Sequence, residues 1–344
     1  MNKKIIIGGI ATILAGIGIY KFISTQNSKN KPGEIWTTAN IPDLTGKVII
    51  VTGANSGVGF EAAKEFARKG AQIILACRSM EKAEAALTEI QAEIPNTQAE
   101  IMQLDLASQA SVHQFANEFK AKNDQLDVLV NNAGIMMTPY GTTEDGFEQQ
   151  FGTNHLGHFA LTGLLIDLLL KTPGSRVVNV SSNGHRFGNM NFANLMFEGG
   201  NDYSPARAYG RSKLANLLFT YELQHRYEAI GADASATAAH PGGSSTNLSR
   251  HIEEQWYFKM FSLLWERIAQ SAAMGALPTI RAAVDPNAKG GYYYGPNGFM
   301  EQGGYPIPVQ SNDASHNRDD AKRLWDVSEE LTAVHYQPLA ATQP

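Results

Sequence analysis

Hydrophobic residues in this chain form short unbroken runs, and the segments between these runs carry apolar residues at every third or fourth position. The runs predict strands at residues 48–52, 73–76, 101–104, 128–130 and 177–180. The segments between them predict helices at residues 57–69, 80–94, 108–122, 146–170 and 208–228. Strands without polar alternation are buried on both faces. The pattern therefore predicts an α/β fold with a single doubly wound parallel sheet of the Rossmann type and helices on both faces.

The carboxyl-terminal third is less regular. Residues 235–239 (SATAA) have weak β propensity, and we predict a strand there because the alternation of strands and helices requires one. Residues 317–332 are predicted to form a closing surface helix. Residues 255–283 predict either an apolar lid over a hydrophobic substrate or a helix packed on the body. The large apolar side chains behind both alternatives are Trp256, Tyr257, Phe258, Met260, Phe261, Leu263, Leu264 and Trp265.

The amino-terminal run at residues 5–23 is apolar except for Lys21, and a polar stretch follows it up to Glu34. An apolar helix of about 20 residues spans a bilayer, so this run is a short transmembrane candidate. A secretory signal and a buried helix of the body are the alternatives, although no clear small-residue cleavage site follows the run. We predict a membrane anchor and linker at residues 1–40 and one α/β domain at residues 41–344.

The composition limits the classes of partner. The 344 residues are 43% hydrophobic and 18% charged, which is enough apolar material for a large core. The net charge of -5 leaves no basic excess to hold a phosphate backbone, so nucleic acid is not an expected partner. The one cysteine, Cys77, can form neither an intrachain disulfide nor a multi-cysteine metal cluster, and no metal site is predicted.

A glycine-rich turn, TGANSGVG, lies between the first predicted strand and the first predicted helix. Glycines in such a turn let the backbone approach a pyrophosphate, and the helix that follows offers free N–H groups. The spacing is G-x-x-x-G-x-G and not G-x-G-x-x-G, and an ordinary βα turn is the alternative. The residues predicted to contact a dinucleotide here are Thr52, Gly53, Asn55, Ser56, Gly57, Val58 and Gly59.

The end of the second predicted strand indicates the type of dinucleotide. A site for NAD places an acidic residue about 20 residues after the glycines, where it binds the ribose 2′-hydroxyl. No acid occurs there, and Arg78 follows Cys77 directly. A guanidinium group can pair with a 2′-phosphate through two N–H groups. NADP(H) is therefore predicted in preference to NAD.

Three residues suggest proton transfer. Tyr209 and Lys213 are four positions apart in a predicted helix and would share one face. Ser182 follows the strand at residues 177–180, and ligands of such sheets bind at the carboxyl ends of strands. A nearby ammonium lowers the pKa of a phenol, and a serine hydroxyl can hold a substrate oxygen. These are the parts of a site that exchanges a proton with an alcohol or a carbonyl.

Together these motifs resemble the short-chain dehydrogenases/reductases over about residues 44–332. They are Thr52-Gly-x-x-x-Gly57-x-Gly59, Asn131-Asn-Ala-Gly134, Ser182 and Tyr209-x-x-x-Lys213. The stretches TNHLGHFALT, YGRSKLANLLFTYEL and HPGGSSTNL are similar to the retinol dehydrogenase branch and its bacterial relatives. The resemblance implies an NADP(H)-dependent oxidoreductase that interconverts a carbonyl and an alcohol on a retinoid-, steroid- or aldehyde-like substrate. It also implies a last strand near residues 292–294. The apolar side chains of the carboxyl-terminal third, and not the resemblance, are the reason for predicting a substrate lid around residues 241–285.

The resemblance also implies a role for each matching residue. Tyr209 would be the general acid/base, Lys213 would hold the nicotinamide ribose, and Ser182 would position the substrate carbonyl. Asn154 would support a proton relay through Lys213. The remaining cofactor contacts would be Asp105, Leu106, Asn132, Ala133, Gly134, Pro241, Gly242 and Thr246. The 27 positions from Ser182 to Tyr209 exceed the spacing of compact family members, and the insertion at residues 191–208 is expected to reshape the substrate mouth.

Two other functions are consistent with the motifs. A light-dependent protochlorophyllide reductase is similar in sequence, but Cys77 lies beside the cofactor region and not beside Tyr209. A non-catalytic NADP-binding sensor or scaffold would be expected to lose Tyr209 or Lys213, and both are present. The predicted partners are a small lipophilic substrate and a membrane, with homodimer formation left open. The catalytic domain is predicted to face the cytoplasm.

Deletion of residues 1–35 tests the predicted anchor. No residue with a predicted chemical role precedes Thr52, so the shortened protein should fold and keep its activity. The full-length protein should sediment with membranes and resist extraction by salt, because apolar burial does not depend on charge screening. Fractionation of cell extracts measures both forms. Full-length protein in the soluble fraction would contradict the anchor, and protease digestion of the domain outside sealed cells would contradict the cytoplasmic orientation.

Overall fold

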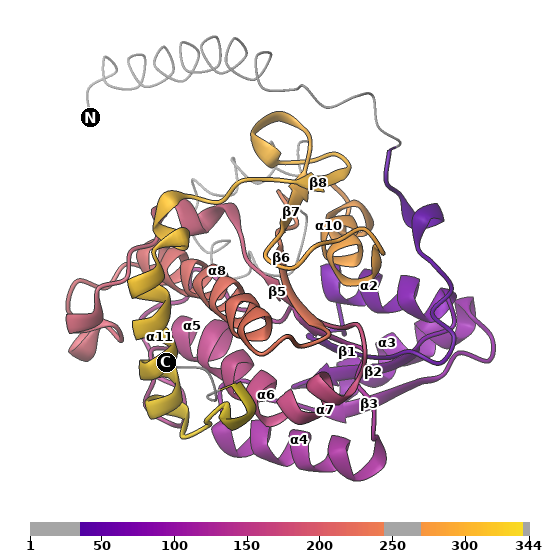
Figure 1. Cartoon of the computed structure of the whole chain (residues 1–344), viewed down its shortest axis with the longest axis horizontal. Helices are drawn as coiled ribbons and strands as arrows, with labels where there is room; N and C mark the ends of the chain where they lie inside the picture. The colour runs from indigo at the N-terminus through magenta and orange to yellow at the C-terminus, as the bar shows by residue number, and fades with distance from the viewer. Residues whose placement is uncertain (1–34, 244–269, 340–344) are drawn as a thin grey trace. The chain divides into compact units, whose positions relative to one another are not determined.

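The computed structural model describes residues 35–243 and 270–339, and Trp36–Pro344 form one compact unit. Within the described part, eight strands form one sheet in the order β3-β2-β1-β4-β5-β6-β7-β8 (Figure 1). Neighbouring strands are parallel as far as β7, and β8 is antiparallel to β7. The strands are β1 (Val48–Thr52), β2 (Gln72–Cys77), β3 (Ala99–Gln103), β4 (Val128–Asn131), β5 (Ser175–Val180), β6 (Ala234–Ala239), β7 (Tyr293–Pro296) and β8 (Pro306–Pro308).

Helices cover both faces of this sheet, as the hydrophobic pattern predicted. One face packs against α2 (Gly57–Arg68), α3 (Met80–Glu93) and α10 (Ala272–Val284). The other packs against α4 (Gln109–Lys122), α6 (Gly157–Leu164), α7 (Ile166–Lys171) and α8 (Pro205–Ala229), with α11 (Arg318–Thr332) against α8. Short helical turns lie at Thr38–Asn40, Asn183–Phe187, Phe192–Asn194, Glu198–Gly200, Phe299–Glu301, Asp313–His316 and Gln337–Leu339.

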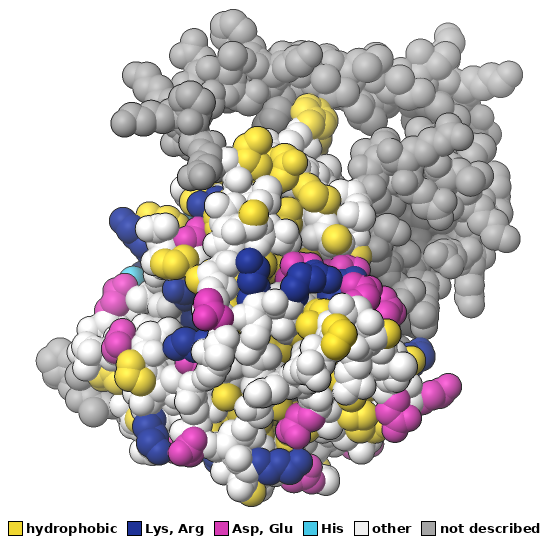
Figure 2. All heavy atoms as spheres, turned by 90° about the vertical axis from the view of Figure 1, so that its right-hand side faces the viewer, with side chains coloured by type: hydrophobic (Ala, Val, Ile, Leu, Met, Phe, Trp, Pro, Cys, Tyr) yellow, Lys and Arg dark blue, Asp and Glu magenta, His cyan; other side chains and the backbone are white. Residues whose placement is uncertain are grey.

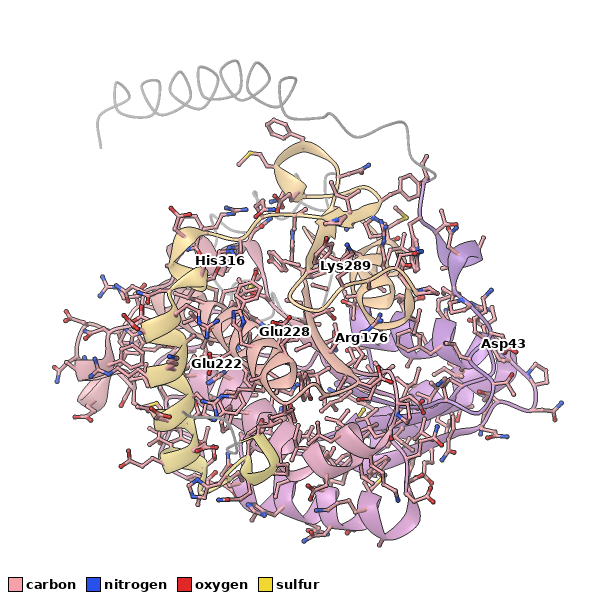
Figure 3. The ribbon with its side chains drawn as sticks, in the orientation of Figure 1. Asp43, Arg176, Glu222, Glu228, Lys289 and His316 are labelled. Carbon is pink, nitrogen blue, oxygen red and sulfur yellow. The ribbon has the colours of Figure 1, made fainter. Side chains whose placement is uncertain are left out.

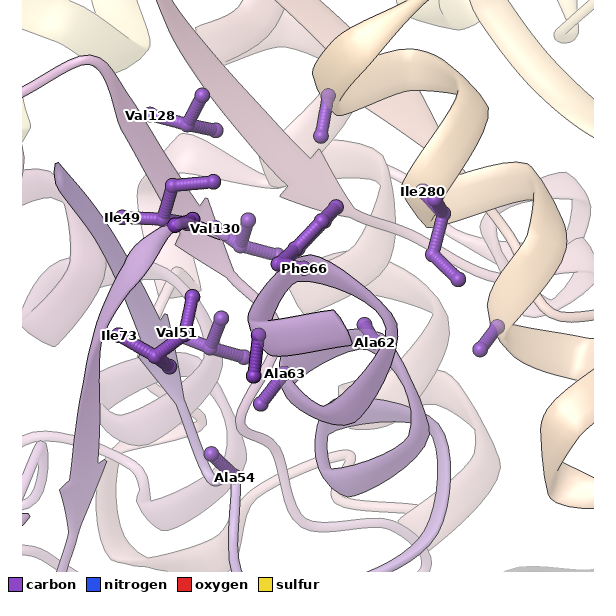
Figure 4. Close-up of a cluster of buried hydrophobic side chains, with 14 of the residues drawn as sticks. Ile49, Val51, Ala54, Ala62, Ala63, Phe66, Ile73, Val128, Val130 and Ile280 are labelled. Carbon is purple, nitrogen blue, oxygen red and sulfur yellow. The ribbon is translucent and has the colours of Figure 1, made fainter. Parts of the chain in front are cut away.

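Alternation along β1 explains the two cores. Ile49 and Val51 point to the face that α2 covers, and Ile50 points to the other. Figure 4 shows Ile49 and Val51 packed with Phe66 of α2 and Ile280 of α10. All five residues of β1 are buried, which is why the strand reads as an unbroken apolar run.

The predicted helix at 146–170 is interrupted in the structure. Gly146 has a φ of +83°, and the Glu148 carboxylate caps the next turn by accepting hydrogen bonds from the Gln150 and Phe151 N–H groups. The helical path therefore begins at α5 (Gln149–Phe151), continues as a π-helical turn at Gly152–Leu156, and then divides into α6 and α7. Single π-helical turns often mark functional sites, and this one contains Asn154.

The segment predicted as lid or packed helix is described only in part. From Ala272 onward it is α10, which packs on the sheet and on α2. Arg176 of β5, labelled in Figure 3, donates hydrogen bonds to the Ala282, Ala283 and Asp285 carbonyls and so satisfies the end of this helix. Residues 255–269, which hold all the aromatic residues of the segment, lie outside the described residues.

The last strand differs from expectation. Residues 292–294 were predicted to end the sheet, but β8 adds an antiparallel edge after β7. Its sequence, Pro-Ile-Pro, reads poorly as a strand because proline lacks an N–H group, and an edge strand tolerates this lack. The helix at 317–332 matches α11, although its inner face is buried around Trp325.

In the described part of the chain, no helix has the length and hydrophobicity needed to cross a bilayer. The apolar run at residues 5–23 lies outside it. On the face drawn in Figure 2, acidic and basic side chains are interspersed and do not form a patch of one sign.

Substitution of Trp325 by alanine tests how α11 is held. The indole is 2% exposed, lies against Phe159 and Tyr336, and donates a hydrogen bond from Nε1 to Glu329. Removing it leaves a cavity, so the free energy of unfolding should fall by about 3–5 kcal/mol. Chemical denaturation measures the change. Lys322→Ala, an exposed position of the same helix, is the control and should change little.

Candidate active site

A cleft lies at the carboxyl ends of the central strands, where the strand order reverses between β1 and β4. Ligands of doubly wound sheets bind at this reversal point. Most of the residues predicted for a cofactor and for proton transfer therefore lie together, although they are far apart in the chain. The lining residues are Gly53, Asn55, Ser56, Gly57, Val58, Gly59, Asn132, Ala133, Gly134, Ile135, Val180, Ser181, Tyr209, Lys213 and Pro241.

The glycine turn is shaped for a close approach. Gly53 and Gly57 have φ values of +65° and +60°, a region that favours glycine. A Cβ on Gly59 would lie 2.4 Å from Asn132 Nδ2. Ser56 begins α2 without a side-chain hydrogen bond to cap it. The first N–H groups of α2 therefore have no side-chain cap, which is the arrangement that binds a pyrophosphate.

Thr52 lies behind the cleft and does not line it. Its side chain is fully buried, and its hydroxyl oxygen accepts hydrogen bonds from the Asn132 and Ala133 N–H groups, both at 2.9 Å. The same oxygen lies 2.9 Å from His158 Nε2. Thr52 therefore holds the turn after β4 against the glycine turn.

His158 was not among the predicted residues, although it lies four positions after Asn154 in the same motif. Its Nδ1 is 3.0 Å from the Asn154 carbonyl, which can only accept, so the ring proton is on Nδ1. Burial lowers the pKa of His158 to about 4 and keeps the ring neutral. Nε2 then accepts from the Thr52 hydroxyl, and one directed chain of hydrogen bonds joins the glycine turn to Asn154.

Tyr209 projects from α8 into the cleft with 8% of its surface exposed. Burial raises the pKa of its phenol, and a hydrogen bond with Ser182 opposes that rise. The ring fits because residue 184 is glycine, where a Cβ would lie 2.8 Å from the Tyr209 ring. Ser181 is buried instead and donates to the Lys213 carbonyl at 2.8 Å, so it shapes the backbone. Ser182 is thus the serine that faces the phenol.

Lys213 is almost fully buried beneath the cleft. Its ammonium donates to the Val180 carbonyl at 3.1 Å and lies 5.8 Å from the centre of the Tyr209 ring. Burial lowers the pKa of Lys213 to about 8. A lysine with this pKa exchanges its proton near physiological pH.

Asn154 approaches Gly134 from the same side as this lysine. A Cβ on Gly134 would be 3.1 Å from Asn154 Oδ1 and 3.4 Å from Lys213 Nζ. The Asn154 amide is fixed by hydrogen bonds to both backbone groups of Ile135, at 2.8 and 3.0 Å, and donates to Ser212 Oγ at 2.9 Å. Asn154 and Lys213 therefore meet at one point of the cofactor cleft.

A second groove adjoins the glycine turn and is lined by Asn55, Ser56, Phe60, Lys82, Ala85, Ala86 and Glu89. Lys82 was not among the predicted residues, although it lies one helical turn after Arg78. Arg78 is exposed at the end of β2, and none of the described carboxylates pairs with it. Lys82 thus lines this groove, whereas Arg78 does not line it but follows β2, whose Ala76 carbonyl accepts a hydrogen bond from the Gly53 N–H group at 2.8 Å.

The other predicted contacts lie in different places. Asp105, after β3, accepts a hydrogen bond from the Ala107 N–H group at 3.0 Å and does not line the main cleft. Leu106 is buried in the core below α6. Gly242 adopts a φ of +64° beside Pro241. Thr246 lies outside the described residues.

Cys77 is buried at the end of β2, and burial raises the pKa of its thiol to about 11. No group of three or more metal-binding side chains occurs in the part of the chain that the structure describes.

The family model for short chain dehydrogenases matches residues 47–256, which places this chain in that family. The protein is therefore an NAD(P)-dependent oxidoreductase. Among its relatives, retinol dehydrogenase 12 of Mus musculus is 40% identical over 305 residues, covering 87% of this chain and 90% of the relative. Retinol dehydrogenase 11 of Homo sapiens is 41% identical over 292 residues, covering 85% and 87%. The chain thus belongs to the branch that resembles retinol dehydrogenases.

Solved structures agree on the fold. An uncharacterized protein from Mycobacterium paratuberculosis is 40% identical and matches with a TM-score of 0.73, covering 88% of this chain and 99% of that one. A short chain dehydrogenase from Shigella flexneri, solved with NADP, is 25% identical with a TM-score of 0.56, covering 73% and 97%. These matches confirm the predicted doubly wound sheet with helices on both faces, and the family.

The lowered pKa of Lys213 predicts a pH dependence. As the pH rises through about 8 the ammonium loses its proton, while the raised pKa of Tyr209 keeps the phenol protonated. The kcat/KM for carbonyl reduction should therefore fall above about pH 8, since this ratio reports the groups of the free enzyme. A pH profile with NADPH measures it. Any activity left in Lys213→Arg should lack this fall, and a flat wild-type profile from about pH 7 to about pH 10 would contradict the assignment.

Proposed function

We propose that the protein is an NADP(H)-dependent enzyme that interconverts a carbonyl and an alcohol on a lipophilic substrate, acting mainly as a reductase. The observation that carries this proposal is that the Tyr209 phenol and the buried Lys213 line the same cleft as the glycine turn, with Ser182 hydrogen-bonded to the phenol. A protonated phenol beside a serine hydroxyl suits donation of a proton to a developing alkoxide.

The chain's own residues would act as follows. The Ser182 and Tyr209 hydroxyls would hold the substrate oxygen, and Tyr209 would give up its proton to that oxygen. Lys213 would stabilise the phenolate that forms, and Asn154 would help to return a proton through Lys213. The bound dinucleotide supplies the hydride in reduction and accepts it in oxidation. The glycine turn would hold its pyrophosphate, and Pro241 with Gly134 would border its nicotinamide end.

NADP is favoured over NAD because of the cations beside the glycine turn. Arg78 follows β2 where an acid would bind a 2′-hydroxyl, and Lys82 lines the groove next to Asn55 and Ser56. Two of the related solved structures, from Shigella flexneri and Escherichia coli, hold NADP or NADPH. This preference supports reduction as the main direction in a cell.

The lipophilic substrate is proposed from the relatives. The two relatives reported above are named retinol dehydrogenases, and retinol is a lipophilic alcohol. The insertion at 191–208 is an ordered structure, because the buried Arg211 donates to the carbonyls of Asn194 and Leu195 at 2.8 and 2.7 Å. Its guanidinium also lies 3.9 Å from the centre of the Phe197 ring. We further propose that residues 1–40 anchor residues 41–344 to a membrane, with a lid around residues 241–285.

Substitution of Tyr209 by phenylalanine tests the proposed chemistry. The change removes the proton donor and keeps the ring, and general acids contribute about 100- to 10,000-fold to rate. NADPH oxidation should fall by that factor with retinal, a steroid ketone or a medium-chain aldehyde as substrate. NADPH binding, followed by its fluorescence, should survive and serves as the control. Near wild-type turnover would remove Tyr209 from the reaction.

Substitution of Arg78 by leucine, alone and with Lys82→Leu, tests the choice of cofactor. Hydrogen bonds to charged groups contribute about 1.5–3 kcal/mol, so each change should weaken NADPH by roughly 10- to 150-fold. NADH binding should change little, because it lacks the 2′-phosphate. The ratio of the two dissociation constants is the measurement. Equal losses for both dinucleotides would show that neither cation contacts this phosphate.

A further inference from the structure

The loop at residues 297–305, between β7 and β8, contacts both sides of the cleft. On the cofactor side, the Gln302 carbonyl accepts a hydrogen bond from the Gly243 N–H group at 2.8 Å. On the serine side, the Met300 carbonyl accepts one from Asn183 Nδ2, and Asn183 directly follows Ser182. Neither connection follows from the predicted proton-transfer residues.

Glu301 makes the central contact of this loop. Its Oε2 lies 3.0 Å from His240 Nε2, and both atoms are buried without a partner that meets hydrogen-bond geometry among the described residues. Its Oε1 lies 3.6 Å from Arg186 Nη2. Arg186 belongs to the same helical turn as Asn183, so one carboxylate joins the segments that carry His240 and Ser182.

His240 is fully buried and directly precedes Pro241, which lines the cofactor cleft. The Gly242 N–H group donates to His240 Nδ1 at 3.3 Å, so Nδ1 is the acceptor and Nε2 carries the proton. The Nε2–H group then faces the Glu301 carboxylate at 3.0 Å, in a close polar contact that lacks hydrogen-bond geometry. The ring is thus contacted at both nitrogens, once by its own loop and once by Glu301.

Close packing leaves this arrangement little freedom. A Cβ on Gly295 would lie 2.0 Å from His240 Nε2, and one on Gly242 would lie 2.8 Å from the Glu301 carbonyl. Met300 and Glu301 both have positive φ values, 51° and 57°, which disfavour residues with a Cβ. Such a backbone persists only when surrounding contacts hold it, and the Glu301 carboxylate supplies two of them.

We propose that Glu301 is a positioning residue of the enzyme. Through His240 it holds the turn that carries Pro241 against the nicotinamide end of the cofactor cleft, and through Arg186 it ties this turn to the segment of Ser182. The proposal rests on the proposed function for its catalytic consequence. The ordering of the His240–Gly243 turn by Glu301 stands without it.

The test compares three substitutions in the full-length protein: Glu301→Ala, Glu301→Gln and Glu301→Asp. Glutamine keeps an oxygen that can accept from His240 Nε2, whereas aspartate keeps the charge but is one methylene too short. Glu65→Ala is the matched control, because Glu65 has a similarly covered side chain and pairs with Arg68 away from the cleft. NADPH affinity and amide hydrogen exchange of a peptide spanning residues 240–243 are measured for each.

Glu301→Ala should weaken NADPH binding by roughly 10-fold and speed exchange of the 240–243 peptide, because it removes a close polar contact made by a charged group. Glu301→Gln should restore most of the NADPH affinity and most of the protection from exchange, whereas Glu301→Asp should restore neither. Glu65→Ala should match the wild type in both measurements. If the alanine variant fails to fold, the comparison of Glu301→Gln with Glu301→Asp tests the proposal, which expects higher NADPH affinity and slower exchange in Glu301→Gln. Exchange unchanged in Glu301→Ala, or aspartate equal to or better than glutamine, would overturn the proposal. Exchange measured without cofactor reports only the order of the 240–243 turn and does not depend on activity. A failure of the protein to reduce any carbonyl would therefore refute the proposed function but not the role of Glu301 in ordering this turn.

Discussion

The site depends on the close approach of two turns, the one after β1 and the one after β4. They touch because the strand order reverses between these two strands, so both carboxyl ends face a gap that no crossover helix fills. Gly59 leaves room for the Asn132 side chain, whose amide donates to the Thr52 carbonyl at 2.8 Å. The Thr52 hydroxyl oxygen also accepts hydrogen bonds from two backbone N–H groups of the facing turn. Without this contact the glycine turn and Gly134 would not border one cleft.

Burial then sets the charges around the cleft. It lowers the pKa of Lys213 to about 8 and that of His158 to about 4, and it raises the pKa of Tyr209. The consequence is a site with a neutral imidazole, a protonated phenol and an ammonium that can lose its proton. The same physical cause therefore produces three different states, because burial favours the neutral form of each group and the ordinary pKa values of an imidazole, an ammonium and a phenol differ.

Loops far apart in the sequence complete the site. The π-helical turn directs Asn154 toward Ile135, and the buried Arg211 fixes the insertion after Ser182. The loop after β7 reaches back to His240 through Glu301. The two residues in each of these contacts do not belong to one local sequence motif. The contacts position the segments that a generic dinucleotide-binding sheet does not have.

The sequence by itself determined the central parallel strands, most of the helices that flank them and the family. Strands buried on both faces must be apolar throughout, and the glycine turn, Arg78 and the Tyr209–Lys213 pair are local patterns with a local reason. The tertiary structure alone decided where the long helix at 146–170 breaks, that a proline-rich edge strand joins β7, and that Lys82, His158 and Glu301 lie beside the site. Each of these depends on a partner distant in the chain, such as Thr52 for His158 and His240 for Glu301. Periodicity reports which face of an element is buried, but not which side chain will be found against it.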